Sequence, residues 1–192
     1  MRTQPEVTPK PVSLLPENQY PVVKIMPARI LVAYATRNGS TAEIAQAIGK
    51  ELTIAGHSVD VAEIKTVSTL AGYNAVVIGG PLYMGNVDGA VRKFVGNNRE
   101  QLQKLPLAAF TVGIAPKTPD PGAVEMAMGA LKKSLEPLTP VSSILFAGKL
   151  DPDKLSFIQR KMTELVKSPV GDFRDWDAIA AWARELPGKM DG

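Results

Sequence analysis

A cluster of small hydroxyl and amide residues ends an apolar run near residue 35. The run Ile30 to Ala35 suits a buried strand, and the residues after the cluster have the spacing of an amphipathic helix. A helix that starts directly after a strand offers unpaired backbone N–H groups and the positive end of its dipole, which together favour a phosphate group. The residues between the two elements can add donors, and they are Thr36, Arg37, Asn38, Gly39, Ser40 and Thr41. The sequence therefore predicts a phosphate-binding loop.

The absence of two motifs limits which phosphate-containing ligands this loop is expected to bind. The chain has no G-x-x-x-x-G-K-[ST] motif, so it offers no P-loop lysine to a nucleoside triphosphate, and no G-x-G-x-x-G motif for a dinucleotide pyrophosphate. Hydroxyl and amide donors fit a single monophosphate better. The alternative interpretation is that Ser40 or Thr41 serves only as the N-cap of the helix.

A glycine-rich segment, "GGPLYMGNVDGAV", follows a later apolar run and has the composition of a site for a flat ligand. Gly79, Gly80 and Gly85 allow close approach of the backbone or a positive φ, while Tyr83 and Met84 can cover a ring. The alternative is an ordinary glycine-rich turn with Tyr83 partly buried.

A third segment, "VGIAPKTPDPG", is stiffened by proline and follows another apolar run. Thr111, Gly113, Lys117 and Thr118 can line the other side of the same ligand. The three segments therefore predict one composite site, provided that the fold brings them together.

The elements that must position these segments alternate between short apolar runs and amphipathic helices, which is the pattern of a parallel sheet with crossover helices. The predicted strands are 29–35, 58–63, 75–79, 107–112 and 143–147, and the predicted helices are 41–55, 87–95, 122–135 and 176–186. Both tryptophans, Trp176 and Trp182, are assigned to the core. Ligands of such sheets bind at the carboxyl ends of the strands, where all three segments begin.

Composition excludes several kinds of chemistry. The chain has no cysteine, which rules out disulfides, thiolate metal sites and thiol catalysis within it, so redox chemistry needs a cofactor. The single histidine, His57, follows a helix-ending glycine and is predicted at the surface, and no metal site is predicted. A net charge of +3 without a basic stripe makes nucleic acid an unexpected partner. The chain has no signal peptide or transmembrane stretch, so a cytoplasmic location is expected.

Two regions lie outside the alternating pattern. Residues 1–27 contain six prolines and are predicted to form an extended or disordered arm, while residues 28–192 form the domain. An additional basic amphipathic helix is predicted over 153–166, before the last helix. It either packs on the body of the domain or contacts a membrane or partner surface through residues 153–167.

Together these residues resemble the flavodoxin family. The likeness covers residues 29–186 and rests on T-x-x-G-x-T after the first strand, the glycine-rich loop with an aromatic residue, and the loop after the fourth strand. It implies a doubly wound α/β fold with five parallel strands in the order 2-1-3-4-5, and FMN as cofactor. It also implies that Thr36 to Thr41 hold the FMN phosphate. The segments that would flank the isoalloxazine ring are Pro81, Leu82, Tyr83, Met84, Gly85 and Asn86, and Thr111, Val112, Gly113, Ile114, Lys117 and Thr118.

Within that family the chain is most similar to the menaquinone-dependent protoporphyrinogen dehydrogenases, through "KLSF" with its following basic helix and the ending "GDFRDWDAIAAWA". This resemblance implies an FMN-dependent oxidoreductase of porphyrin biosynthesis that passes electrons from a reduced organic substrate to a quinone. No catalytic acid or base is identified, because the flavin carries the redox step. Lys117 is the cation expected to favour the anionic reduced flavin.

Two other functions stay open. One is a flavodoxin-like electron carrier with a protein redox partner, although such carriers are usually acidic and this chain carries +3. The other is a domain that has lost its cofactor and serves assembly through the N-terminal arm. A dimer and a peripheral position at the inner membrane face are both compatible with the sequence.

Overall fold

A parallel sheet in the order β2-β1-β3-β5-β6 forms the centre of the structure. The computed structural model describes residues 28–113, 121–151, 161 and 170–190. The sheet strands are β1 (Arg29–Tyr34), β2 (Ser58–Glu63), β3 (Ala75–Tyr83), β5 (Leu107–Gly113) and β6 (Ser142–Ala147), and the short β4 (Asn86–Val87) pairs antiparallel with β3. Apart from β4, this is the predicted five-stranded order 2-1-3-4-5, so the fold expected from the sequence is confirmed.

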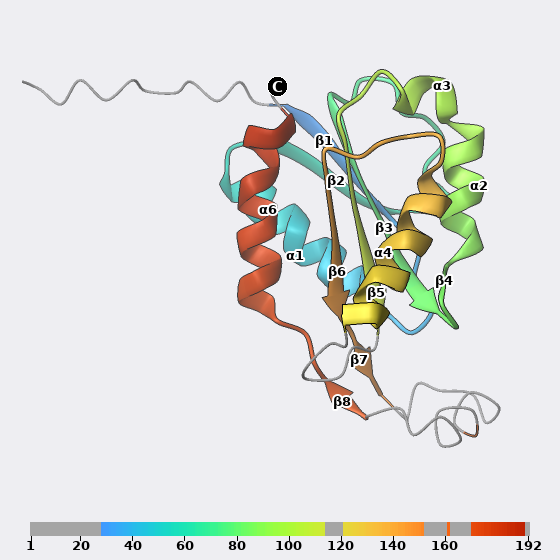
Figure 1. The fold of residues 1–192 in the computed structure, drawn as a ribbon. Coiled ribbons are helices and arrows are strands. Elements are labelled where there is room, and N and C mark those ends of the chain that lie inside the picture. Colours follow the sequence, from blue (N-terminus) through green and yellow to red (C-terminus); the bar gives the residue numbers. More distant parts are fainter. Residues whose placement is uncertain (1–27, 114–120, 152–160, 162–169, 191–192) are drawn as a thin grey trace, which may run out of the picture.

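Helices cover both faces of the sheet, as a doubly wound fold requires (Figure 1). Helices α1 and α6 lie on one face, and α2, α3 and α4 lie on the other. Their bounds are α1 (Ser40–Ile54), η1 (Ile64–Thr66), α2 (Gly89–Asn97), α3 (Arg99–Leu102), α4 (Pro121–Leu135) and α6 (Trp176–Met190). In the described ranges, no helix is both long and apolar enough to cross a membrane. The helix predicted over 153–166 and the arm at 1–27 lie outside those ranges.

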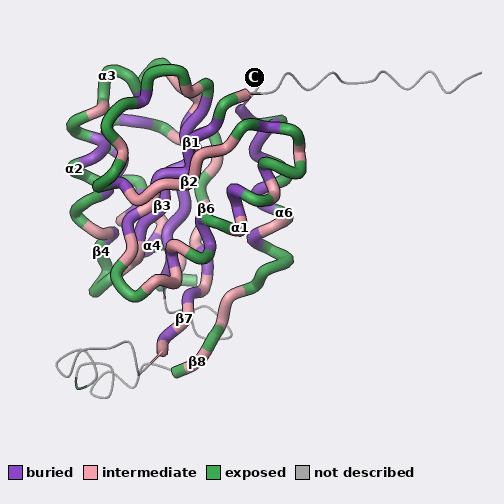
Figure 2. The backbone as a smooth tube through the Cα atoms, turned by 180° about the vertical axis from the view of Figure 1, so that it is seen from behind, coloured by how far each residue is buried: buried purple, intermediate pink, exposed green. Residues whose placement is uncertain are grey.

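The strand pleat divides the apolar side chains between two cores. Figure 2 shows that much of the central sheet, including β1, is buried. Along β1, Ile30 and Val32 join the core under α1 and α6, while Leu31 and Ala33 join the core under α2 and α4. In the first core, the rings of Phe110, Phe146 and Trp182 lie with centroids 5.6–6.2 Å apart. Burial of each such apolar side chain stabilises the fold by roughly 1.5–3 kcal/mol. These contacts hold the covering helices against the sheet.

Two glycines in the middle of β3, Gly79 and Gly80, are required for packing. A Cβ on Gly79 would lie 2.1 Å from Cζ of Phe110, and one on Gly80 would lie 2.6 Å from Cγ2 of Val91. This packing explains why glycine occupies both positions, and the prediction that the two glycines let the backbone approach a flat ligand stays a prediction. The aromatic ring on one face and the helix α2 on the other occupy the space that a side chain would need.

His57 and Trp176 differ from their predictions. His57 is only 5% exposed, and its Nδ1 accepts a hydrogen bond from the backbone N–H of Ala28 at 3.2 Å. The residue follows the end of α1, but the start of β1 lies against it and buries the imidazole. Trp176 is 44% exposed because it is the first residue of α6, ahead of the buried stripe that begins at Ile179, whereas Trp182 lies in the core as predicted.

A second, two-stranded sheet lies beside the start of α1. It consists of β7 (Lys149–Leu150) and β8 (Gly171–Asp172), which pair antiparallel. Arg174 follows β8, and its side chain is 6% exposed. Its guanidinium donates to Asp172 at 2.5 and 2.8 Å, binds the carboxylate of Glu43 on α1, and lies over the Trp176 ring. These contacts fasten the β7–β8 sheet to α1.

Substituting Gly79 is expected to destabilise the fold. In Gly79→Ala the new methyl group meets the Phe110 ring, so the free energy of unfolding should fall by about 1–3 kcal/mol. Gly96→Ala in α2 is the matched control, because a Cβ there meets nothing within 4 Å. It should raise the free energy of unfolding by roughly 0.5 kcal/mol through better helix propensity. Urea unfolding followed by circular dichroism measures both, and equal effects would contradict the packing explanation.

Substituting Asp172 is expected to change stability in a pH-dependent way. The hydrogen bonds from Arg174 lower the pKa of Asp172 from 3.8 to about 2, although partial burial opposes the shift. Folding therefore favours the carboxylate, and this contribution is complete above pH 3.8 and declines as the pH falls toward 2. Asp172→Asn should be less stable than the wild type at pH 7, and the gap should narrow between about pH 4 and 2.

The control for this experiment is Glu100→Gln, which removes an exposed carboxylate from α3. Its effect at pH 7 should be smaller than that of Asp172→Asn. Urea midpoints measured from pH 7 down to pH 2.5 supply the comparison. A gap for Asp172→Asn that stays constant over this range would show that the ion pair with Arg174 does not contribute to folding.

Candidate functional site

The loops predicted to bind a ligand start at the same edge of the sheet. Strands β1, β3 and β5 are parallel neighbours, so their carboxyl ends lie together, at the lower end of the view in Figure 1. The backbone N–H of Ala35 donates to Gly79 O at 2.9 Å, and the N–H of Gly148 donates to Gly113 O at 2.8 Å. These bonds continue the sheet pairing into the loops. The fold thus brings together segments that are more than 70 residues apart in the sequence.

The first loop leaves the start of α1 open. Gly39 is the residue before the helix and adopts a left-handed backbone with φ 89°, and no side chain caps this end. Its N–H donates to Oγ1 of Thr36 at 3.1 Å, which closes the loop into a tight turn. The interpretation of Ser40 or Thr41 as the N-cap is therefore wrong. The N–H groups of the first helical turn have no acceptors within the helix, so this end suits an anion.

The hydroxyl side chains of this loop differ in their surroundings. Thr41 is 2% exposed and sits at the edge of the core. The Ser40 hydroxyl accepts a hydrogen bond from the backbone N–H of Lys149 at 3.0 Å, which joins the loop to β7. Arg37 and Asn38 are exposed. The loop is thus fixed by Thr36, Ser40 and Thr41, while its outer surface is polar.

The second loop is a tight hairpin between β3 and β4. Met84 and Gly85 have φ values of 49° and 73°, and Tyr83 pairs with Asn86 across the turn. Two consecutive positive φ angles are typical of the type I′ turn that suits a two-residue hairpin. The prediction of a positive φ at Gly85 is confirmed. Tyr83 is 36% and Met84 is 71% exposed, so the hairpin offers a large apolar surface to a ligand.

The third segment enters the site from a buried strand. Thr111, Val112 and Gly113 are all buried, and the Thr111 hydroxyl donates to the backbone oxygen of Gly80 at 3.0 Å. Thr111 therefore links β5 to β3 beneath the hairpin. Ile114, Lys117 and Thr118, which were predicted to flank the ligand, lie outside the described residues.

Asp88 is a residue of this edge that the sequence interpretation missed. Its Oδ1 accepts from the N–H of Ala90 at 3.0 Å and caps α2, and its Oδ2 accepts from Nε of Arg37 at 2.8 Å. Partial burial alone raises the pKa of Asp88, but the hydrogen bonds from Ala90 and Arg37 outweigh it, and the pKa lies below its ordinary value. The predicted helix, 87–95, includes Asp88, whereas α2 starts at Gly89 and Asp88 is its N-cap. Aspartate is a common N-cap residue, but that signal does not identify the partner Arg37.

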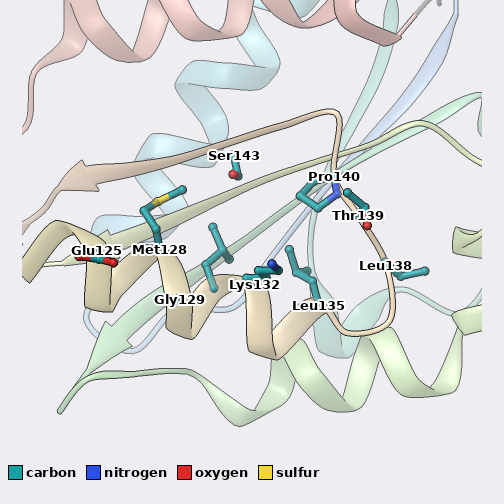
Figure 3. A pocket seen from close by; sticks show the side chains of 10 residues that line it. Glu125, Met128, Gly129, Lys132, Leu135, Leu138, Thr139, Pro140 and Ser143 are labelled. Carbon is teal, nitrogen blue, oxygen red and sulfur yellow. The ribbon is translucent and has the colours of Figure 1, made fainter.

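A separate cavity of about 420 Å³ lies between α4, the loop after it and the start of β6. Figure 3 shows its wall, with Met128, Lys132 and Leu135 on α4 and Thr139 and Pro140 on the following loop. None of the residues predicted to bind a ligand lines it. Within the described ranges, no group of three or more metal-ligating side chains comes together.

The arrangement at the strand edge fits FMN in two respects. The open N-terminus of α1, with Gly39 in the left-handed region, provides backbone donors for a phosphate dianion. The exposed hairpin with Tyr83 provides a surface for a flat ring. Both features lie at the carboxyl ends of neighbouring strands, where ligands of open α/β sheets bind.

Comparisons with known proteins agree with this geometry. Residues 31–177 match the family model described as "Flavodoxin domain". Protoporphyrinogen IX dehydrogenase (quinone) of Escherichia coli strain K12 is 26% identical over 175 residues, which is 85% of this chain and 97% of that protein. The Streptococcus pneumoniae TIGR4 flavodoxin matches with a TM-score of 0.56 and 17% identity, over 84% of this chain and 99% of its own.

A flavoprotein of Lactobacillus acidophilus NCFM in complex with FMN also matches, with a TM-score of 0.50 and 11% identity, over 62% of this chain and 93% of its own. These structural likenesses concern the fold. The family match covers most of the chain, and the sheet order and edge loops agree with it. The protein therefore belongs to the flavodoxin domain family, whose cofactor is FMN.

Proposed function

We propose that this protein is an FMN-dependent oxidoreductase that takes electrons from a reduced organic substrate and passes them to a quinone. The observation that carries the proposal is the open N-terminus of α1 beside the exposed hairpin of Tyr83 and Met84. The isoalloxazine ring of FMN supplies the redox chemistry, and the protein binds and orients it.

Each segment of the edge has a distinct part in holding the cofactor. The first-turn N–H groups of α1 and the hydroxyl and amide side chains between Thr36 and Thr41 bind the phosphate. The hairpin from Pro81 to Asn86 and the segment from Thr111 to Thr118 flank the ring. The Thr111 hydroxyl ties β5 to β3, so the two flanking segments start from strands that are joined to each other.

Protoporphyrinogen IX is the substrate we propose, with a quinone as electron acceptor. The name of the Escherichia coli relative, which is 26% identical, states both for that protein. A substrate with carboxylates, such as a porphyrinogen, is attracted to a chain with a net charge of +3. We further propose that residues 153–167 contact a membrane surface, from which a quinone would be reached.

A flavodoxin-like electron carrier is the second candidate, and the shared fold favours it. Electron carriers of this kind exchange single electrons with a protein partner, whereas the proposed dehydrogenase removes two electrons from an organic substrate. Reductive titration of the FMN-loaded protein distinguishes them. Two separate one-electron steps favour the carrier, and one two-electron step favours the dehydrogenase.

The proposed activity is tested with the full-length protein loaded with FMN under anaerobic conditions. Addition of protoporphyrinogen IX and a menaquinone analogue should produce porphyrin fluorescence at a rate proportional to protein concentration. A protein that binds FMN but never oxidises protoporphyrinogen would contradict the proposed substrate. A protein that fails to bind added FMN would contradict the proposed cofactor site.

Gly39 supplies a matched variant for the cofactor site. Gly39→Ala places a side chain in the left-handed region, which costs roughly 1–2 kcal/mol, so the affinity for FMN should fall about tenfold. Gly96→Ala, with open space around its Cβ, should leave the affinity unchanged. Quenching of FMN fluorescence measures both, and an unchanged affinity in Gly39→Ala would place the phosphate elsewhere.

A further inference from the structure

Arg37 belongs to the first loop, but its guanidinium contacts the second. Nε donates to Oδ2 of Asp88 at 2.8 Å, and Cζ lies 4.7 Å from the centre of the Tyr83 ring. Tyr83 is the last residue of β3 and Asp88 follows β4, so these partners stand 46 and 51 residues further along the chain. The side chain therefore bridges the phosphate loop and the hairpin.

Asp88 is a firm anchor for this bridge. Its carboxylate also caps α2 through the N–H of Ala90, and its own backbone N–H donates to Pro81 O at 3.0 Å, at the base of the hairpin. The side chain of Asp88 is 19% exposed, against 44% for Arg37. Apart from its pairing with Arg37, Asp88 is held by one hydrogen bond to its carboxylate and one from its backbone N–H, so Asp88 sets the position of the guanidinium.

The hairpin has little else to hold its tip. Tyr83, Met84, Gly85 and Asn86 are all exposed, and a Cβ on Gly85 would meet nothing within 4 Å. The hydrogen bond from the Asn86 side chain to Met84 O is internal to the turn. The cation–π contact with Arg37 links the Tyr83 ring to the loop before α1.

We propose that Arg37 is a positioning residue for the flavin ring and not a ligand of the phosphate. It holds Tyr83 and the hairpin at a set distance from the phosphate loop. The distance between the ring site and the phosphate site then fits the distance between the ring and the phosphate of FMN. This inference rests on the proposed FMN site. It revises the part expected for Arg37 from the sequence, where it stood among the phosphate-binding residues.

The charge balance agrees with this role. The guanidinium is paired with the Asp88 carboxylate, which partly cancels its attraction for a phosphate dianion. The backbone N–H groups of α1 have no such competitor within the helix. The N–H groups of α1 therefore bind the phosphate, whereas the Arg37 side chain positions the hairpin.

Riboflavin provides the test, because it carries the isoalloxazine ring without the phosphate. Arg37→Ala should weaken the binding of riboflavin and FMN by the same factor, about three- to tenfold, through loss of the cation–π contact and the ion pair. Arg37→Lys keeps the charge but not the planar group, so it should lose affinity for both ligands as well. Arg99→Ala, which removes the same charge from α3, is the control and should leave both affinities unchanged.

Asp88→Asn supplies a second variant, because it keeps an oxygen that can cap α2 but removes the ion pair with Arg37. It should also weaken riboflavin binding, and circular dichroism confirms that each variant is folded. Loss of FMN affinity with unchanged riboflavin affinity in Arg37→Ala would overturn the inference and return Arg37 to the phosphate. No change for either ligand would overturn it too. A wild type that binds neither ligand would instead refute the proposed function.

Discussion

The parallel pairing of β1, β3 and β5 determines where the loops of the candidate site lie. Parallel neighbours end at the same edge, so their loops meet there however far apart they stand in the sequence. The ladder from Ile30 opposite Ala75 to Pro81 opposite Val112 sets the register of all three strands. The candidate site thereby combines three features: the loop before α1, the β3–β4 hairpin and the buried end of β5.

Close packing under this edge makes the register specific. Gly79 and Gly80 have no room for side chains because Phe110 lies on one face and Val91 on the other. Gly79 packs against the ring of Phe110 on β5 and Gly80 packs against Val91 on α2, so the hairpin that continues β3 starts from a closely packed base. The contrast between a packed base and an exposed tip explains why Tyr83 needs a partner outside its own hairpin.

Polar contacts across long sequence separations join the loops above that base. Ser40 meets Lys149, Arg37 meets Asp88, and Arg174 meets Glu43. The first of these ties the phosphate loop to β7, and the last ties the end of β8 to α1. The segment between β7 and β8 therefore starts and ends beside the predicted phosphate site.

Local sequence patterns, together with the family resemblance, predict the fold class and the strand order correctly and locate the loop between β1 and α1. Apolar runs and amphipathic spacing are local patterns, and β1 and α1 follow from them to within a residue or two. The contacts that individual side chains make depend on the tertiary structure. The start of β1 buries His57, and the Phe110 ring fills the space beside Gly79. Arg37 donates a hydrogen bond to Asp88. These partners lie at least 29 residues away along the chain, and no local pattern encodes such a pairing, because it exists only once the strands are in register.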